Sequence, residues 1–304
     1  MRVSIVGSGA VGSLFAANLA TLDDVEVWAF DLNRSHVDAI KKNGLQLVGA
    51  GAVTGHPHAT SDAAELPACD FGIVATKAMH TEAAIAATAA AFADGCVATV
   101  QNGLGNEEAI AKHAERVIRG TTFPAGKLVE PGHVQWDVKG DTTLGPFEPR
   151  PASSDEIERL ADACTRAGMP TKAVPDARGP QWRKVIFNAA TNPVGALTRL
   201  THGRVCENVE LRKLVSGLVD EGKAVAAAQG IELDADPEEL IDHAARPEVA
   251  YGHKASMLQD VEARRTTEID YLNGGIVRFG DEHGVPTPLN RAIWSLVKGL
   301  EQSW

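Results

Sequence analysis

The feature that most constrains the fold is a glycine-rich loop near the start of the chain. The β-branched run RVSIV (residues 2–6) is followed at once by GSGAVG (residues 7–12), which opens the helical pattern GSLFAANLATL (residues 12–22). A strand, a G-x-G-x-x-G loop and a helix in this order are the dinucleotide-binding fingerprint of a doubly wound α/β sheet. The start of the helix then offers N–H groups and a positive dipole to a pyrophosphate. We predict that the whole glycine loop contacts the dinucleotide, through Gly7, Ser8, Gly9, Ala10, Val11 and Gly12.

An acidic residue at the end of the next strand bears on which dinucleotide is bound. Asp31 ends VEVWAFD, nineteen positions after Gly12, where a carboxylate normally accepts hydrogen bonds from the adenosine ribose hydroxyls. A carboxylate there would repel a 2′-phosphate, so the sequence favours NAD over NADP. Two alternatives stay open: Asp31 merely caps the following helix, or Arg34 binds the phosphate of NADP.

The rest of the first half repeats the alternation of strand and helix. Short β-rich runs such as DFGIVAT and CVATV alternate with Ala-rich helical stretches such as TEAAIAATAAAFA, which is typical of βαβ units on a parallel sheet. Residues 117–147 have Gly and Pro turns and partial two-residue alternation, so we expect antiparallel strands that close one edge of that sheet. Residues 155–168 are predicted to be helical, and TKAVPD to hold a last short strand.

From about residue 180 onward every pattern is helical. We therefore predict a Rossmann-like α/β domain over residues 1–176, with a mostly parallel sheet that has an antiparallel edge, and an all-helical substrate domain over residues 177–304. Lys77 and Asn102 follow two of the predicted strands, where this fold places its ligands. For Lys77 alone, an exposed loop lysine is the favoured interpretation, and turn chemistry before Gly103 would explain Asn102 equally well.

Composition narrows the class of partner. The formal net charge of −11 and the pI of about 5.4 argue against a nucleic-acid or anionic-membrane surface, since either needs clustered Lys and Arg. No apolar run approaches the roughly 20 residues that span a bilayer, and the chain begins with a strand pattern instead of a leader, so we expect a cytoplasmic protein. The four cysteines are far apart, so we expect reduced thiols and no metal site. A small-molecule ligand is favoured.

The segment WRKVIFNAATNP (residues 182–193) is mostly apolar but carries Lys184, Asn188 and Asn192 at a spacing of four. Positions four apart on a helix drift by only about 40°, so these three side chains, here called the polar stripe, share one face. Buried polar groups need partners. The stripe therefore predicts either an interhelical hydrogen-bond network with Lys184 reaching water, or the wall of a cleft that binds an oxyanionic ligand.

A second buried charge strengthens the cleft interpretation. Glu268 lies in SMLQDVEARRTTEIDYLNGGIVRF (residues 256–279), which we predict to be one helix, on an apolar and glycine-rich face. A carboxylate on such a face needs a cation or a hydrogen-bond donor. Lys184 is one candidate, and Arg264 or Arg265 is the alternative that would make Glu268 purely structural.

Together these motifs resemble the ketopantoate reductase (2-dehydropantoate 2-reductase) family along nearly the whole chain. The resemblance is carried by GSGAVG, TKAMHTE around Lys77, QNGLGNEE around Asn102, RGTTFPAG followed by EPGHV, WRKVIFNAATNP, and SMLQDVEARRTTEIDYLNG. The last two motifs are the specific ones, because the glycine loop alone fits many dehydrogenases. The resemblance implies a Rossmann domain joined to a helical domain, with the active site in the cleft between them.

The resemblance also implies a role for each matching position. Lys184 matches the general acid, and Glu268 matches the glutamate that supports it and holds the substrate hydroxyl. Asn188, Asn192 and Ser256 match positions that contact the substrate. Lys77 and Asn102 match positions that line the junction between cofactor and substrate.

Two positions depart from the family pattern. The family usually has an arginine at the end of the second strand for the 2′-phosphate of NADP, where this chain has Asp31. Ahead of Ser256 the family often has Asn-x-x-Ser, where this chain has His253. An imidazole differs from a carboxamide in size, donor pattern and charge, so the substrate acid is expected to differ from ketopantoate if His253 contacts it.

The expected function is hydride transfer between a nicotinamide dinucleotide and a 2-oxo or 2-hydroxy acid. The main alternative is an NAD-dependent 2-hydroxyacid dehydrogenase on the same scaffold with a different substrate, which Asp31 and His253 favour. A non-catalytic dinucleotide-binding sensor is the remote alternative. The helical C-terminal region, which ends in PLNRAIWSLVKGLEQSW, would serve as a homodimer interface or as an internal core.

Overall fold

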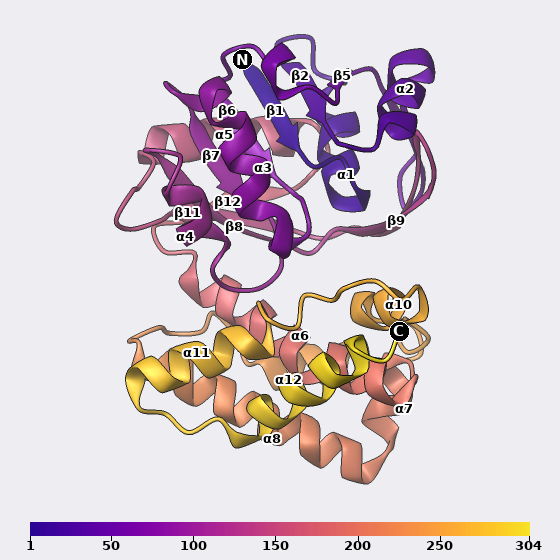
Figure 1. The fold of residues 1–304 in the computed structure, drawn as a ribbon, viewed down its shortest axis with the longest axis vertical. Helices are drawn as coiled ribbons and strands as arrows, with labels where there is room; N and C mark the ends of the chain where they lie inside the picture. Colours follow the sequence, from indigo (N-terminus) through magenta and orange to yellow (C-terminus); the bar gives the residue numbers. More distant parts are fainter. The chain divides into compact units, whose positions relative to one another are not determined.

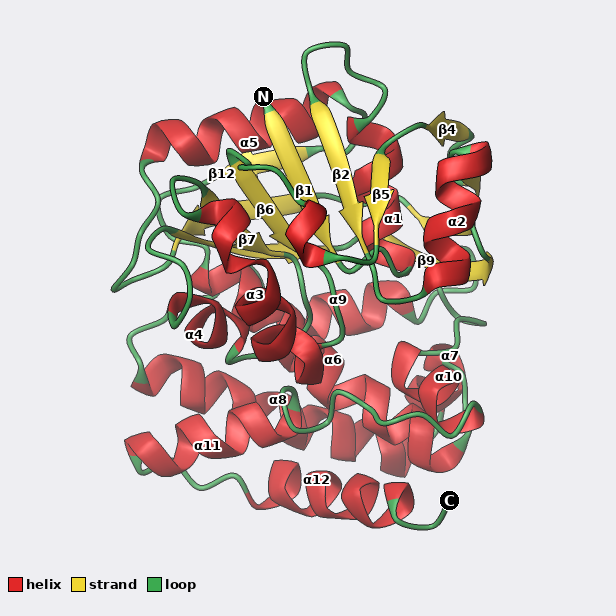
Figure 2. Cartoon of the chain, turned by 45° about the horizontal axis from the view of Figure 1, so that its top comes forward, coloured by secondary structure: helices red, strands yellow, loops and turns green.

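The computed structural model describes all 304 residues, and they divide into two compact units. The first unit consists of Met1–Gln101 with Asn106–Ala177, and the second of Asn102–Gly105 with Arg178–Trp304. Every strand lies in the first unit and the second is helical (Figure 2). The predicted fold class is therefore confirmed.

The main sheet of the first unit has eight strands. They are β1 (Arg2–Val6), β2 (Glu26–Phe30), β5 (His58–Thr60), β6 (Phe71–Val74), β7 (Cys96–Thr99), β8 (Val117–Thr122), β11 (Thr142–Pro146) and β12 (Thr171–Ala173). Their order across the sheet is β12-β11-β8-β7-β6-β1-β2-β5. From β5 to β8 all neighbours are parallel, whereas β11 runs antiparallel to β8 and parallel to β12. The predicted antiparallel edge is present, and TKAVPD holds the predicted last strand.

A second, four-stranded sheet corrects part of the expectation for residues 117–147. It consists of β3 (Leu45–Gly49), β4 (Val53–Gly55), β9 (Ala125–Glu130) and β10 (His133–Val138), in the order β4-β3-β10-β9. We expected β9 and β10 at the edge of the main sheet, and this is wrong. Val134 and Trp136 of β10 are buried together with Leu45 and Leu47 of β3, so pairing β10 with β3 gives these short strands one shared apolar face.

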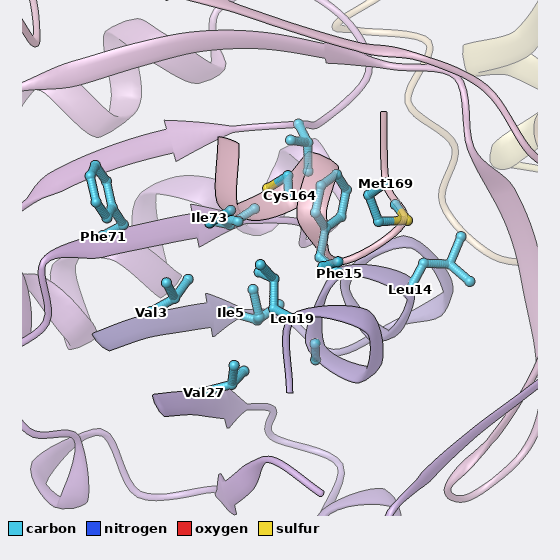
Figure 3. Close-up of a cluster of buried hydrophobic side chains, with 14 of the residues drawn as sticks. Val3, Ile5, Leu14, Phe15, Leu19, Val27, Phe71, Ile73, Cys164 and Met169 are labelled. Carbon is cyan, nitrogen blue, oxygen red and sulfur yellow. The ribbon is translucent and has the colours of Figure 1, made fainter. Parts of the chain in front are cut away.

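Five helices belong to the first unit. They are α1 (Ala10–Leu19), α2 (Arg34–Asn43), α3 (Thr81–Thr88), α4 (Asn106–Ala111) and α5 (Ser154–Arg166), and the 3₁₀ segments η1 (Ala63–Glu65), η2 (Ala78–His80) and η3 (Ala89–Phe92) lie among them. Helix α1 is buried from Gly12 to Leu19 because it contacts strands of both sheets. A helix with neighbours on all sides has to be apolar all round. Its Leu14, Phe15 and Leu19 belong to the same buried apolar cluster as Val3 and Ile5 of β1 (Figure 3).

The second unit is built around one long helix (Figure 1). Its helices are α6 (Arg178–Thr198), α7 (His202–Glu207), α8 (Val209–Ala228), α9 (Pro237–Ala244), α10 (Ser256–Glu262), α11 (Asn273–His283) and α12 (Pro288–Glu301). Helix α6 contacts α7, α8, α9, α10 and α12. Because α6 is surrounded by other helices, most of its surface is buried, which explains the apolar character of WRKVIFNAATNP.

Helix α6 continues through Pro193, which has no N–H for the carbonyl of Ala189 one turn earlier. The buried side chain of Asn273 supplies that bond, because its Nδ2 donates to the Ala189 oxygen at 2.9 Å. The same nitrogen donates to Asn290 Oδ1 at 2.9 Å, and Asn290 Nδ2 donates to Glu221 at 2.8 Å. This network joins α6, α11, α12 and α8, and it keeps α6 helical beyond Asn192.

No helix combines the length and the apolar character that crossing a bilayer requires. The four cysteines are free. No three side chains of the His, Cys, Asp and Glu types gather at a spacing suited to a metal ion.

Candidate active site

The glycine loop lies at the carboxyl end of β1, between its neighbours β2 and β6. Strand order reverses at this point, and open α/β sheets bind their ligands there. Gly7 has a φ of 92°, and a Cβ on it would lie 2.5 Å from Thr76 Cγ2. A Cβ on Gly12 would lie 2.0 Å from the carbonyl oxygen of Gly7. Both positions therefore require glycine for the turn and for close packing of helix on strand.

Gly9 differs from the other two, because a Cβ placed on it would meet no atom within 4 Å. The space beside its backbone is open, and α1 begins there without a side-chain cap or an acidic residue in its first turn. Its first N–H groups are therefore available to an anion. These observations fit a dinucleotide pyrophosphate. The Ser8 side chain is buried and its hydroxyl has no hydrogen-bond partner, so only the backbone of Ser8 is suited to the ligand.

Asp31 does not cap α2. The cap is Asn33, whose side chain accepts from the N–H of His36. One oxygen of Asp31, Oδ1, accepts from the Asn33 N–H at 2.9 Å, and the other makes no hydrogen bond within the chain. Asp31 thus keeps one oxygen without a partner in the chain, and the capping alternative is wrong. Arg34 is exposed at the first residue of α2.

Lys77 follows β6 and is half-buried, so the interpretation as an exposed loop lysine is wrong. The loop that carries it is held by Gln101, a buried residue that the sequence patterns did not single out. Gln101 Nε2 contacts the Thr76 oxygen at 2.8 Å and Thr81 Oγ1 at 2.8 Å, and its Oε1 accepts from Thr99 Oγ1 at 3.0 Å. Gln101 therefore connects the loops after β6 and β7. The sequence signal that could have identified Gln101 is its position directly before Asn102, at the end of a predicted strand.

The polar stripe lies on α6 as predicted. Asn188 and Asn192 are each only 8% exposed, and Lys184 is half-buried. The side chain of Asn188 makes no hydrogen bond within the chain, and that of Asn192 only accepts one from its neighbour Thr191. The buried interhelical network of this unit runs through Asn273 and Asn290 instead. The two asparagines of the stripe therefore take no part in an interhelical hydrogen-bond network, and their amide nitrogens donate to no group of the chain.

Glu268 is not in a helix, which corrects the predicted single helix over residues 256–279. Helix α10 ends at Glu262, and Arg264 has a φ of 51°, a left-handed conformation that interrupts a helix. Glu268 lies in the connection to α11, where its carbonyl accepts from the N–H groups of Tyr271 and Leu272. The same-face argument for Glu268 was thus wrong, although the residue is buried as expected, at 6% exposure.

Lys184 and Glu268 interact electrostatically. Burial lowers the pKa of the Lys184 ammonium to about 8, and the Glu268 charge opposes that shift, which is the expected combination. Asn102 Nδ2 donates to Glu268 Oε2 at 3.5 Å. Arg265 is paired with Asp260 at 3.1 Å, and neither it nor Arg264 forms an ion pair with Glu268. The alternative in which these arginines neutralise Glu268 is therefore wrong.

His253 and Ser256 lie on the surface of the helical unit. Ser256 is the first residue of α10, and α10 packs against α6. The carbonyl of His253 accepts from the N–H of His202 at 3.1 Å. The structure thus brings together Lys184, Glu268 and Asn102, with Asn188 and Asn192 in line on α6. It shows no hydrogen bond or ion pair between these residues and the side chain of His253 or Ser256.

Comparison with known proteins agrees with this arrangement. Residues 3–149 match the family model described as Ketopantoate reductase PanE/ApbA, and residues 176–301 match Ketopantoate reductase PanE/ApbA C terminal. A 2-dehydropantoate 2-reductase from Archaeoglobus fulgidus is 36% identical over 302 residues, covering 99% of this chain and 98% of the relative. The corresponding enzyme from Pyrococcus horikoshii is 34% identical over 304 residues, with the same coverage.

Solved structures add two similar chains. A PanE/ApbA family ketopantoate reductase from Ralstonia eutropha JMP134 has a TM-score of 0.89 and 31% identity, with 99% of each chain covered. A D-mandelate dehydrogenase, in a ternary structure with NADH and anilino(oxo)acetate, has a TM-score of 0.90 and 30% identity, with 100% of this chain and 99% of that chain covered. These relatives are enzymes, which argues against the alternative of a non-catalytic sensor. The chain belongs to the ketopantoate reductase PanE/ApbA family of NAD(P)-dependent oxidoreductases.

Proposed function

We propose that this protein reduces a 2-oxo acid to the corresponding 2-hydroxy acid, with NADH as the preferred reductant and Lys184 as the proton donor. The observation that carries the proposal is the pair formed by half-buried Lys184 and buried Glu268, beside two asparagines whose amide nitrogens are unused. A half-buried ammonium with a lowered pKa, next to hydrogen-bond donors, suits a substrate on whose oxygen negative charge develops.

In this proposal the two parts of the chain bind different ligands. Residues 1–176 bind the dinucleotide, through the glycine loop, Asp31 and the loop that carries Lys77. Residues 177–304 bind the acid. The reduced nicotinamide, when bound, supplies the hydride to C2 of the 2-oxo acid, and the protein provides orientation and charge.

Lys184 acts on the carbonyl oxygen of the substrate. Its ammonium first donates a hydrogen bond to that oxygen and then a proton, as the carbonyl becomes a hydroxyl. A pKa of about 8 leaves the lysine mostly protonated at neutral pH but still able to release its proton, which is the balance that a general acid needs. Glu268 keeps the ammonium charged before the reaction and accepts a hydrogen bond from the product hydroxyl.

The asparagines of the polar stripe orient the acid. Each amide nitrogen has two N–H donors that match carboxylate or carbonyl oxygens. Because Asn188 and Asn192 follow Lys184 at successive turns of one rigid helix, they hold the carboxylate at a fixed distance from the proton donor. Asn102 orients Glu268, and Ser256 is proposed as a further donor to the substrate.

NADH is preferred because Asp31, directly after β2, has one free carboxylate oxygen. That oxygen suits the ribose 2′-hydroxyl of NAD and repels the 2′-phosphate of NADP. NADH in the ternary structure of the D-mandelate dehydrogenase supports the same choice. Arg34, which is exposed at the first residue of α2, offers a cation to the 2′-phosphate of NADPH. We therefore expect the enzyme to prefer NADH without excluding NADPH completely.

Two substrates are proposed, in order. Ketopantoate is the first, supported by the 36% identical 2-dehydropantoate 2-reductase. A bulkier 2-oxo acid is the second, supported by His253 in place of the usual asparagine and by the similarity to the D-mandelate dehydrogenase, since mandelate carries a phenyl group on the hydroxyl-bearing carbon.

A substrate and cofactor panel tests this function. Ketopantoate, benzoylformate and smaller 2-oxo acids are each assayed with NADH and with NADPH. We expect turnover of at least one branched or aromatic 2-oxo acid, with a higher kcat/KM for NADH. In Asp31→Asn, which keeps the Oδ1 contact to Asn33, the ratio of kcat/KM for NADH to that for NADPH should fall by about tenfold, about 1.4 kcal/mol. Turnover with NADPH alone would contradict the cofactor choice, and no turnover of any 2-oxo acid would contradict the reaction.

A further inference from the structure

A buried histidine that the proposed reaction does not use lies directly behind the glycine loop. His36 is only 1% exposed and stands in the first turn of α2, where its N–H is capped by Asn33. Its Nδ1 accepts from the N–H of Gly132 at 3.0 Å. Nδ1 is thus the acceptor of the ring, and the proton of the neutral imidazole resides on Nε2. Burial lowers the pKa of His36, which agrees with a neutral ring.

The protonated nitrogen of His36 points at the backbone of the glycine loop. Nε2 lies 3.5 Å from Ser13 Oγ, and the Ser8 backbone opposes the lowering of the His36 pKa. Ser13 Oγ donates to the Ser8 carbonyl at 2.8 Å. The Ser8 carbonyl is therefore held by Ser13 from the first turn of α1, and the His36 ring supports this contact from the first turn of α2.

The Ser8 carbonyl matters because a peptide unit is planar. The C=O of Ser8 and the N–H of Gly9 belong to one peptide group and point in opposite directions. Holding the carbonyl inward therefore turns the Gly9 N–H outward, on the residue whose Cβ position is open. Without these anchors the peptide group can rotate about the two soft torsions that flank it, ψ of Ser8 and φ of Gly9.

The ring also ties the glycine loop to two other segments. Gly132, in the turn between β9 and β10, donates to Nδ1, and its carbonyl accepts from the N–H of Gln46 at 2.9 Å. Helix α2 begins three residues after Asp31. His36 thus connects the glycine loop to the helix that follows Asp31.

We infer that His36 is a positioning residue for the dinucleotide, which together with Ser13 fixes the Ser8–Gly9 peptide so that the Gly9 N–H faces a pyrophosphate oxygen. The inference rests on the dinucleotide site proposed above. His36 itself touches no ligand and acts through this peptide and through its link to α2.

Two substitutions separate the contacts of the ring. In His36→Gln the side-chain amide nitrogen can take the place of Nε2 and donate to the Ser8 carbonyl, while the acceptor for Gly132 is lost. In His36→Asn the amide oxygen can take the place of Nδ1 and accept from Gly132, while the donor to Ser8 is lost. Ser13→Ala removes the other anchor of the Ser8 carbonyl.

The readout is the dissociation constant of NADH, from the change in its fluorescence on binding to the full chain without substrate, together with Tm. We expect His36→Gln to bind NADH within about twofold of the wild type but to lose Tm. His36→Asn and Ser13→Ala should each weaken NADH binding by about three- to tenfold, the range of one lost hydrogen bond. The Ser13→Ala/His36→Asn double variant should lose more than the product of the two single effects, because the carbonyl then has no anchor.

Other results would overturn the role of His36. Wild-type affinity for NADH in His36→Asn and in the double variant would show that the peptide needs no anchor. Equal loss of affinity in His36→Gln and His36→Asn, in proportion to Tm, would show that the ring only stabilises the fold. If the wild type bound neither NADH nor NADPH, the dinucleotide site would be wrong and this role with it.

Discussion

Replacing Lys184 with alanine is expected to lower kcat for reduction of the 2-oxo acid by about 10²–10⁴-fold, the usual contribution of a general acid. The carbonyl oxygen then gains its negative charge without a proton donor, while NADH binding, which depends on the glycine loop, stays at the wild-type level. Lys184→Met should show the same loss, because it keeps the aliphatic stem of the side chain and removes only the ammonium.

The matched control for Lys184 is Lys223→Ala. Lys223 lies in the same helical unit but is paired with Asp236 at 2.6 Å, and its loss should leave kcat within about twofold, since a partly exposed ion pair contributes little. Steady-state kinetics at saturating NADH give kcat for each variant, and Tm shows whether the variant is folded. A Lys184→Met enzyme that is folded and turns over like the wild type would remove Lys184 from the reaction.

Replacing Gly9 with valine is expected to weaken NADH binding by about 10²-fold while the fold survives. The φ of Gly9 is −64°, which any residue adopts, and a Cβ there meets no atom within 4 Å. The valine side chain therefore costs only about 1 kcal/mol as a poorer N-cap. It fills the space through which a pyrophosphate would reach the backbone, and the loss of two charge-assisted hydrogen bonds, about 3 kcal/mol together, corresponds to about 10²-fold.

The contrast to Gly9→Val is Gly12→Ala. A methyl group on Gly12 would lie 2.0 Å from the Gly7 carbonyl oxygen, so this smaller substitution should lower Tm more than Gly9→Val does. NADH titration and thermal unfolding of the two variants separate loss of the site from loss of the fold. If Gly9→Val bound NADH as tightly as the wild type, the pyrophosphate would not lie against this loop.

Features encoded by a short stretch of chain were predicted from the sequence. The glycine loop is one, because the turn at Gly7 and the contact of Gly12 with Gly7 involve residues only a few positions apart. The polar stripe is another, since helical geometry alone places Lys184, Asn188 and Asn192 on one face. The alternation of strands and helices likewise predicted the parallel part of the main sheet.

Features that depend on distant segments were missed or wrong. Strand β10 pairs with β3, nearly ninety residues earlier, and no local pattern encodes that partner. Helix α10 ends because Arg264 adopts a left-handed conformation without the glycine that usually marks such a position. The contacts of Gln101 with Thr76 and of His36 with Gly132 also join residues far apart in sequence.

The pH dependence of kcat/KM, measured for reduction and for oxidation, tests whether Lys184 is the proton donor. Because burial lowers the pKa of Lys184 to about 8, its acid form is present below pH 8. Reduction should therefore be flat up to about pH 8 and fall about tenfold per pH unit above it. Oxidation of the 2-hydroxy acid, which needs the neutral amine as base, should rise through the same pH and then level off.

The comparison enzyme is Lys184→Arg, whose guanidinium keeps its proton throughout this range. Its residual reduction activity should lose the fall above pH 8. We expect opposite wild-type profiles with a shared midpoint near pH 8 that disappears in Lys184→Arg. Wild-type profiles that are flat through pH 8, or the same midpoint in Lys184→Arg, would contradict the assignment of Lys184 as the proton donor.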